Sequence, residues 1–310
     1  MDLLNDMKDW YNHTLENGDA RVQGWMFMQG PGSTVTICLS YVYFVKVLGP
    51  FLMKNRRPLV LHRVMLLYNF VMVFASIYLF YKLGILGWFG KYSYTCQPVD
   101  YSDNPDATEM VHITWWYYIS KFVEFSDTIF FVLRKKFSHI STLHVIHHGV
   151  MPISVWWGVK FTPGGHSTFF AFVNSFVHII MYIYYGLAAA GPQMQKYLWW
   201  KKYMTTIQMI QFIAIFLHAF QLLFRECDYP KGFMWFIGFH AVLFWFLFWD
   251  FYKKAYKKPG SRFKKCENDS CDESLKSNNI RNTNGVHKKE MKIHENGANT
   301  KNGIKVMKEA

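Results

Sequence analysis

The sequence lacks the features that are typical of secreted, disulfide-rich and strand-rich proteins. Its 310 residues contain five cysteines, too few for a disulfide framework. Residues 1–33 hold no short apolar run followed by a small-residue cleavage site, so no cleavable signal peptide is expected. We find neither the apolar–polar alternation that predicts strands nor an internal repeat. An all-helical protein is the interpretation that remains.

The mean hydropathy is also low, close to zero, because an apolar centre is averaged with polar ends. Apolar residues make up 51% of the chain and aromatic residues 19%, and both are concentrated in residues 34–252. Seven segments there have the roughly 20 mainly apolar residues that cross a bilayer. They are residues 34–53, 64–83, 112–132, 142–160, 167–188, 204–224 and 232–252. The sequence therefore predicts an all-α integral membrane protein with seven transmembrane helices.

The net charge of +13 does not indicate nucleic-acid binding, because the basic residues are not gathered on one soluble surface. They lie in clusters after the first, third, fifth and seventh segments: Lys54, Arg56, Arg57 and Arg63; Arg134, Lys135 and Lys136; Lys196, Lys201 and Lys202; Lys253, Lys254, Lys257 and Lys258. Basic loops stay in the cytosol. The C-terminus is therefore expected in the cytosol and the N-terminus in the lumen.

This orientation divides the chain into three parts. Residues 1–33 form a lumenal N-terminal segment, residues 34–252 the seven-span membrane domain, and residues 253–310 a basic, disordered cytosolic tail. Asn12 begins a glycosylation sequon in the lumenal segment. Cys96 and Cys227 fall in two predicted lumenal loops, where an oxidising compartment favours a disulfide over two unrelated free thiols.

Ionisable residues inside the third segment are the first sign of a functional site, because charges are costly within a membrane. Lys121, Glu124 and Asp127 are spaced by three residues and share one side of a helix. A buried salt bridge that only holds helices together would explain Lys121 and Glu124. Asp127 is predicted to orient a catalytic histidine.

Three histidines occur within five residues of the fourth segment: His144, His147 and His148. Further polar residues on the next two segments are expected to face them: Asn174, His178, Tyr182, Tyr185, Gln208 and Gln211. Packing alone rarely explains such a concentration inside a membrane. Single histidines in spans, such as His218 and His240, are interpreted instead as satisfied helix contacts.

Two kinds of chemistry compete for the histidine cluster. A di-iron desaturase or hydroxylase needs several histidine boxes and only one is present, although spacing alone leaves a single metal ion open. An imidazole can instead attack an acyl thioester, with a second imidazole as base and amide or phenol donors for the oxyanion. A seven-span receptor or carrier is a third alternative, disfavoured because the polar cluster lies on the cytosolic side.

Four motifs occur in order: Lys121-x-x-Glu124-x-x-Asp127-Thr128, His144-x-x-His147-His148, His178-x-x-Met181-Tyr182-x-Tyr184-Tyr185 and Thr205-x-x-Gln208-x-x-Gln211. Together they resemble the very-long-chain fatty acid elongase family, the 3-oxoacyl-CoA synthases of the endoplasmic reticulum, over residues 20–258. The resemblance implies that six of the seven helices form a barrel around an acyl tunnel. It also implies that acyl-CoA and malonyl-CoA condense to 3-oxoacyl-CoA, CO2 and CoA, without a metal or other cofactor.

The resemblance further implies roles for individual residues. His147 would carry the acyl group and His178 would assist the second half-reaction, with His144, His148 and Asp127 as further catalytic residues. Substrate contacts are expected from Lys121, Glu124, Asn174, Tyr182, Tyr185, Gln208 and Gln211. The family's lumenal disulfide would join Cys96 to Cys227.

The resemblance also places the protein in the endoplasmic-reticulum membrane. Expected partners are membrane lipid, the 3-oxoacyl-CoA reductase and dehydratase that complete the elongation cycle, and a second copy of the chain, but no nucleic acid. Very long and polyunsaturated acyl chains are the favoured substrates. A tunnel from the histidines would end near the lumenal ends of the sixth and seventh segments, with Phe216, Phe220, Phe239 and Leu243 as candidates for its blind end.

Overall fold

The computed structural model describes residues 2–257, and every regular element among them is helical. The α-helices of this part of the chain are α1 (Asp2–Glu16), α2 (Gly32–Tyr43), α3 (Gly49–Met53), α4 (His62–Leu83), α5 (Pro105–Val123), α6 (Phe125–Leu133), α7 (Thr142–Phe161), α8 (Thr168–Ala189), α9 (Lys201–Phe220) and α10 (Lys231–Tyr252). Short 3₁₀ and π segments extend or join them.

Helices occupy all seven segments that the sequence predicts to cross the membrane. Five helical stretches are long and apolar enough to do so: Gly32–Met53, His62–Trp88, Gly165–Ala189, Lys201–Phe224 and Lys231–Tyr256. The third and fourth predicted segments are helical as well, but they carry the charged and polar residues described above. The prediction of an all-helical membrane protein is confirmed for the described residues.

The third predicted segment is two helices rather than one. Asn104 caps α5 by accepting a hydrogen bond from the Ala107 backbone N–H at 2.8 Å, and Pro105 suits the first turn. The helix ends at Val123, and α6 starts after the single intervening residue Glu124. Glu124 itself keeps helical dihedral angles, and Lys121, Glu124 and Asp127 are all buried.

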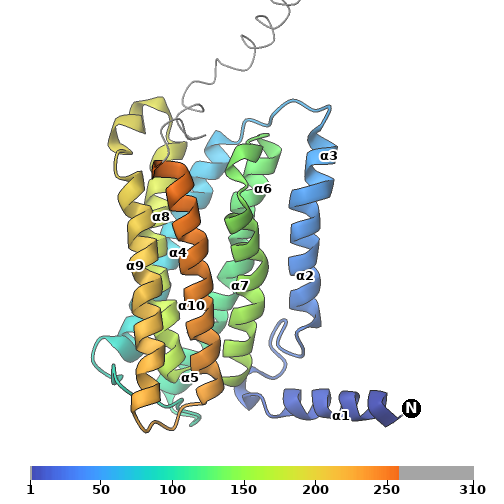
Figure 1. Ribbon diagram of the computed structural model, residues 1–310, viewed down its shortest axis with the longest axis vertical. Coiled ribbons are helices and arrows are strands. Elements are labelled where there is room, and N and C mark those ends of the chain that lie inside the picture. Colours follow the sequence, from blue (N-terminus) through green and yellow to red (C-terminus); the bar gives the residue numbers. More distant parts are fainter. Residues whose placement is uncertain (1, 258–310) are drawn as a thin grey trace, which may run out of the picture. The chain divides into compact units, whose positions relative to one another are not determined.

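Helices distant in sequence lie side by side (Figure 1). Helix α4 packs along α8, α9 packs along α10, and α7 contacts α2, α5 and α10. Ser141 caps α7 by accepting a hydrogen bond from the His144 backbone N–H, which fixes the start of the helix that carries the histidines. Trp156 anchors its other end, fully buried and donating its indole N–H to the Phe27 carbonyl at 2.8 Å.

A loop held by a disulfide connects several helix ends on one side. Cys96 is bonded to Cys227, which follows α9, and their Cα atoms are 5.7 Å apart. The carbonyl of Gln97 in the same loop accepts a hydrogen bond from His166 N–H at 2.8 Å, just before α8. Gly165 makes this approach possible, because it has a φ of +64° and a Cβ there would meet the loop backbone.

The predicted N-terminal segment contains a helix, α1, that hydropathy alone did not predict. The chain turns after α1, and the backbone N–H of Asp19 donates to the carbonyl of Lys160 at 2.7 Å, near the end of α7. Of the predicted tail, residues 253–257 continue α10 as a π-helical turn. Its remaining residues lie outside the described part of the chain.

Candidate active site

Lys121 and Glu124 form an ion pair deep within the helices. The Lys121 ammonium nitrogen lies 2.6 Å from Glu124 Oε1, and only 2% and 1% of the two residues are exposed. Nδ1 of His178, on α8, lies 3.3 Å from the same oxygen. Because an uncompensated buried charge is strongly unfavourable, the three side chains act as one charged unit.

Asn174 and Tyr117 complete the surroundings of Lys121. The ammonium donates to Asn174 Oδ1 at 3.3 Å, and the Tyr117 hydroxyl donates to the same oxygen at 2.8 Å. The ammonium also lies 4.3 Å from the centre of the Tyr117 ring, a cation–π contact. Tyr117 was not among the predicted site residues, although its position four residues before Lys121 places it on the same helix face.

Glu124 makes the histidine contact that the sequence assigned to Asp127. Asp127 Oδ2 instead accepts a hydrogen bond from the Tyr182 hydroxyl at 3.1 Å, and Asp127 bonds to no histidine among residues 2–257. A carboxylate can only accept, so the contact with Glu124 suits a proton on Nδ1 of His178. Its Nε2 is then available for proton transfer.

His144 is held by a chain of hydroxyl groups. Its Nε2 lies 2.7 Å from Thr128 Oγ1, which lies 2.8 Å from the Tyr41 hydroxyl on α2. The His148 ring packs against the His144 ring, with centroids 4.5 Å apart, and is buried. Both side chains are therefore positioned by their neighbours.

His147 and His148 both lack a side-chain hydrogen bond to any residue that the structure describes, but His147 is half-buried whereas His148 is buried. The His147 ring contacts the rings of His148 and Phe244, with both centroid distances at 5.1 Å. Of these two histidines, His147 is the one whose ring contacts the cavity wall, at Phe244.

Gln208 and Tyr185 flank this site on α9 and α8. The Gln208 amide nitrogen lies 3.7 Å from Met181 Sδ, so α9 contacts the stretch of α8 that follows His178. Tyr185 is half-buried, and its ring centroid lies 6.2 Å from that of Tyr182. Neither side chain hydrogen-bonds to a histidine in the described chain.

Two buried oxygen atoms near these residues have no hydrogen-bond partner among the described residues. They are Oε2 of Glu124 and Oε1 of Gln211, and both residues are at least 96% buried. Unpaired buried acceptors are rare in folded proteins and indicate a missing donor. Each atom is free to accept a hydrogen bond from water or from a bound molecule.

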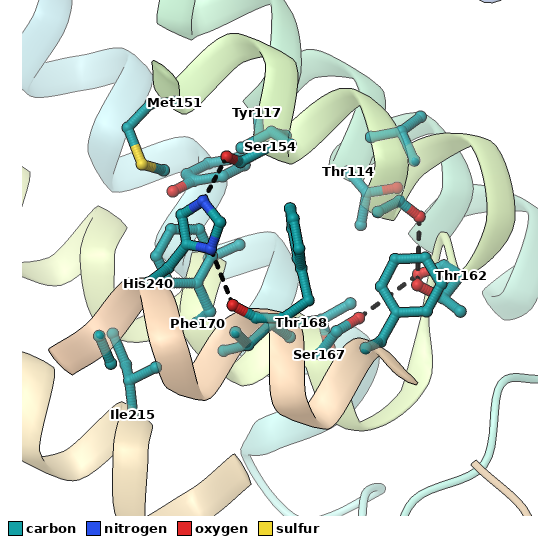
Figure 2. A pocket seen from close by; sticks show the side chains of 18 of the residues that line it. Thr114, Tyr117, Met151, Ser154, Thr162, Ser167, Thr168, Phe170, Ile215 and His240 are labelled. Atoms are coloured by element: carbon teal, nitrogen blue, oxygen red, sulfur yellow. Dashed lines mark hydrogen bonds between the residues drawn. The ribbon is translucent and has the colours of Figure 1, made fainter. Parts of the chain in front are cut away.

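A partly open, apolar cavity of about 80 Å³ lies beside this polar cluster, and Figure 2 shows side chains that line it. Its walls come from α5, α7, α8, α9 and α10, and residues such as Met151, Val155, Phe170, Phe212, Ile237 and Ala241 line it. Tyr117 and Phe244 belong both to the cavity wall and to the surroundings of Lys121 and His147. The apolar lining suits the apolar part of a ligand.

The cavity extends towards the helix ends joined by the disulfide loop. Phe244 and Phe233 line it on the same helix, and at about 1.5 Å per residue they are roughly 16 Å apart along the axis. Thr162 and Ser167, between α7 and α8, line the far end.

The four residues predicted for the blind end do not line this cavity. Phe239 and Leu243 are 61% and 46% exposed, on the outer face of α10, while Phe216 and Phe220 pack against each other beside it. Their role at the end of an acyl tunnel stays a prediction, because sequence alone does not give the rotation of a uniformly apolar helix.

His240 has its hydrogen bonds satisfied, as predicted, but it also lines the cavity. Figure 2 shows its ring between Ser154 and the backbone of α10. Nδ1 donates to the Phe236 carbonyl at 2.8 Å, so Nε2 accepts from the Ser154 hydroxyl at 2.8 Å. His218 retains one buried nitrogen, Nε2, without a partner in the described chain. The prediction therefore holds for His240 and only in part for His218.

Residues 2–257 contain no preformed metal-binding site. No group of three or more His, Cys, Asp or Glu side chains there is arranged to hold a metal ion. The histidines instead contact hydroxyl groups, aromatic rings and one carboxylate.

Comparisons with known proteins agree with the resemblance carried by the four motifs. A family described as "ELO: GNS1/SUR4 family" matches residues 26–264. A very long chain fatty acid elongase of Aedes aegypti is 59% identical over 84% of this chain and 74% of its own length. Very long chain fatty acid elongase 7 of Drosophila melanogaster is 55% identical, covering 85% and 81%, and very long chain fatty acid elongase 1 of Homo sapiens is 46% identical, covering 80% and 90%. The chain therefore belongs to the ELO (GNS1/SUR4) family of very long chain fatty acid elongases.

Proposed function

We propose that this protein catalyses the first step of an elongation cycle, the condensation of a long-chain acyl-CoA with malonyl-CoA. The products are 3-oxoacyl-CoA, CO2 and CoA. The observation that carries the proposal is the position of His147. Its imidazole has no hydrogen-bond partner among the described residues, packs against His148, and touches Phe244 in the wall of the apolar cavity.

In the first half-reaction, a ring nitrogen of His147 attacks the thioester carbonyl carbon. A carbon–nitrogen bond forms, the carbon–sulfur bond breaks, and CoA leaves as the thiolate and is protonated. The acyl chain occupies the apolar cavity, and hydrogen-bond donors near the histidines stabilise the oxyanion. Lys121, fixed by Glu124, Asn174 and Tyr117, supplies positive charge on this side of the site.

In the second half-reaction, malonyl-CoA loses CO2 and the resulting enolate carbon attacks the acyl-imidazole. The new carbon–carbon bond forms as the carbon–nitrogen bond breaks, which returns His147 to its free state. His178, with Nδ1 turned to Glu124, uses Nε2 to hold or move a proton at the malonyl group. Neither half-reaction needs an oxidant or a cofactor.

Three further residues help to position the reacting groups: His144, His148 and Asp127. His144 is bonded to Thr128, and Asp127 to Tyr182, so each pair fixes a side chain next to the reacting groups. Buried Gln211 offers its unpaired oxygen to a substrate donor, and Gln208 and Tyr185 line the same approach.

We further propose seven membrane spans, with the polar α5–α6 and α7 segments as the third and fourth, and a six-helix barrel around the cavity.

The protein would lie in the endoplasmic-reticulum membrane with its N-terminus in the lumen and its C-terminus in the cytosol. The reductase and dehydratase of the cycle, and a second copy of the chain, are the proposed partners. Glycosylation of Asn12, read as a gel shift lost in Asn12→Gln, tests the side of the N-terminus.

The decisive experiment is incorporation of labelled malonyl-CoA by microsomes that express wild type or His147→Ala, across a panel of acyl-CoAs. His13→Ala, on the exposed surface of α1, is the matched control. We expect incorporation by wild type and the control, and none by His147→Ala at equal expression. Incorporation by no acyl-CoA, with well-expressed wild type, would refute condensation.

A second measurement separates acyl transfer from iron chemistry. Purified wild type given acyl-CoA without malonyl-CoA should release one equivalent of CoA and gain one acyl group on His147, detected by mass spectrometry. Stoichiometric iron together with no CoA release would favour a desaturase or hydroxylase instead.

A further inference from the structure

Helix α1 has two faces of opposite character. Its apolar side chains Leu4, Met7, Trp10, Tyr11 and Leu15 recur every three or four residues. At about 100° per residue they fall within an arc of roughly 140°. The remaining surface carries Asn5, Asp6, Lys8, Asp9, Asn12, His13 and Glu16. The helix is therefore fully amphipathic, although the surrounding segment is polar in composition.

Most of the apolar face has no protein partner in the described chain. Leu4 is 74% exposed, Trp10 69% and Met7 58%. Only its C-terminal end is packed, where Leu15 joins the buried cluster around Val22 and Met28. Exposed apolar side chains that share one helix face, a tryptophan among them, indicate a surface that another phase or molecule covers.

The contacts that hold α1 fix the direction of this face. Directly after α1, Asp19 N–H is bonded to Lys160 at the end of α7, and a side chain at Gly18 would collide with that of Lys160. The Tyr11 hydroxyl lies close to Gly30, two residues before the apolar helix that starts at Gly32. The side of α1 that bears Tyr11 thus faces the beginning of a membrane span, and Figure 1 shows α1 lying crosswise to the long helices, near the end at which α2 begins.

Tryptophans gather beside this point, as they do at the headgroup level of membranes. Trp25 stacks on His112 with centroids 4.5 Å apart, and the Trp115 indole donates to the Met26 carbonyl at 3.2 Å. Trp116, next to it, is 51% exposed. The linker between α1 and α2 thus has the aromatic composition that is typical of the boundary between acyl chains and headgroups.

We propose that α1 lies in the plane of the membrane surface, with Leu4, Met7 and Trp10 inserted beside the start of α2. Such helices bury their apolar face about 5–10 Å into the boundary between headgroups and acyl chains. The polar face carries Asp6, Asp9 and Glu16 against a single Lys8, so attraction to anionic lipid plays no part. The partner is the neutral, zwitterionic lipid surface next to the spans.

The polar face then points away from the bilayer. Asn12 lies on this face and is exposed, so an attached glycan would extend into the aqueous phase. The lipid contact and the predicted sequon are compatible because they use opposite sides of one helix.

The test uses spin labels on full-length protein in phosphatidylcholine nanodiscs. Cysteine replaces Met7 on the apolar face or Asp9 on the polar face, with Cys38, Cys266 and Cys271 changed to serine and the disulfide retained. Collisions with oxygen, which concentrates in lipid, are compared with those of a water-soluble nickel complex. We expect the oxygen-to-nickel ratio at position 7 to exceed that at position 9 several-fold.

Two results would overturn the proposal. Equal ratios with mobile spectra at both positions would mean that α1 is surrounded by water. An immobile label at position 7 that neither reagent reaches would mean protein coverage, and dipolar coupling between labels on two copies would identify a second copy as the cover. Because the readout needs no turnover, the outcome is independent of whether condensation is the reaction.

Discussion

One oxygen of Glu124 contacts two nitrogen atoms: Nζ of Lys121 at 2.6 Å and Nδ1 of His178 at 3.3 Å. The shared oxygen connects the break between α5 and α6 to the middle of α8. Its neighbour Oε2 has no partner among the described residues. Glu124 therefore both balances the charge of Lys121 and orients the ring of His178.

Replacing Glu124 by glutamine should abolish most activity without a change in shape. The amide keeps the size of the carboxylate but loses the charge that holds His178 with its proton on Nδ1. Losing an oriented acid–base group typically costs about 10²- to 10⁴-fold. The measurement is malonyl-CoA incorporation at equal expression, with Asp127→Asn as the matched control. We expect a smaller loss for the control, and the reverse order would show that Asp127 is the orienting carboxylate after all.

Replacing Lys121 by methionine should destabilise the protein as well as inactivate it. Methionine fills the space of the lysine stem but leaves Glu124 buried without its cation, a change that costs about 3–5 kcal/mol. Thermal unfolding in detergent measures this as a lowered Tm. The double variant Lys121→Met/Glu124→Leu should recover most of the Tm but no activity, whereas an unrecovered Tm would mean that packing, not charge, explains the single variant.

Filling the cavity at Ala241 should shorten the products. Ala241 is 3% exposed and lies in the cavity wall, so phenylalanine there would occupy space meant for the acyl chain. Product profiles by chromatography after wild-type and variant incubations give the comparison. Phe239→Ala changes a neighbouring residue that is 61% exposed on the outer face, and we expect its profile to match wild type. If the products of Phe239→Ala changed in length while those of the Ala241 variant did not, this cavity would not be the acyl site.

Removing the disulfide should loosen the loop that joins the helix ends. Cys96 and Cys227 are separated by 131 residues, and closing such a long loop typically contributes about 2–4 kcal/mol. Cys96→Ser/Cys227→Ser should unfold at a lower Tm than wild type. A reducing agent should lower the Tm of wild type towards that of the double variant and leave the variant unchanged. A wild type insensitive to reduction would argue that the bond contributes little.

The sequence by itself determined the membrane character, the helix positions and the inventory of the site. All seven predicted segments are helical because length and apolarity decide which stretches form long helices in a membrane. The histidines of α7 and the charged residues of α5 and α6 were recognisable because polar groups in apolar surroundings are conspicuous.

Only the tertiary structure decided which of these groups meet. The spacing of Lys121, Glu124 and Asp127 predicts one continuous face, and in the structure this face meets Asn174, His178 and Tyr182 of α8 in that order. Spacing alone did not show which carboxylate would meet the histidine. The sequence does not predict the rotation of α10 either, because an almost uniformly apolar helix has no pattern that distinguishes its inner face. Spacing along the chain fixes neighbours within one helix, whereas contacts between helices depend on rotations and breaks that packing alone sets.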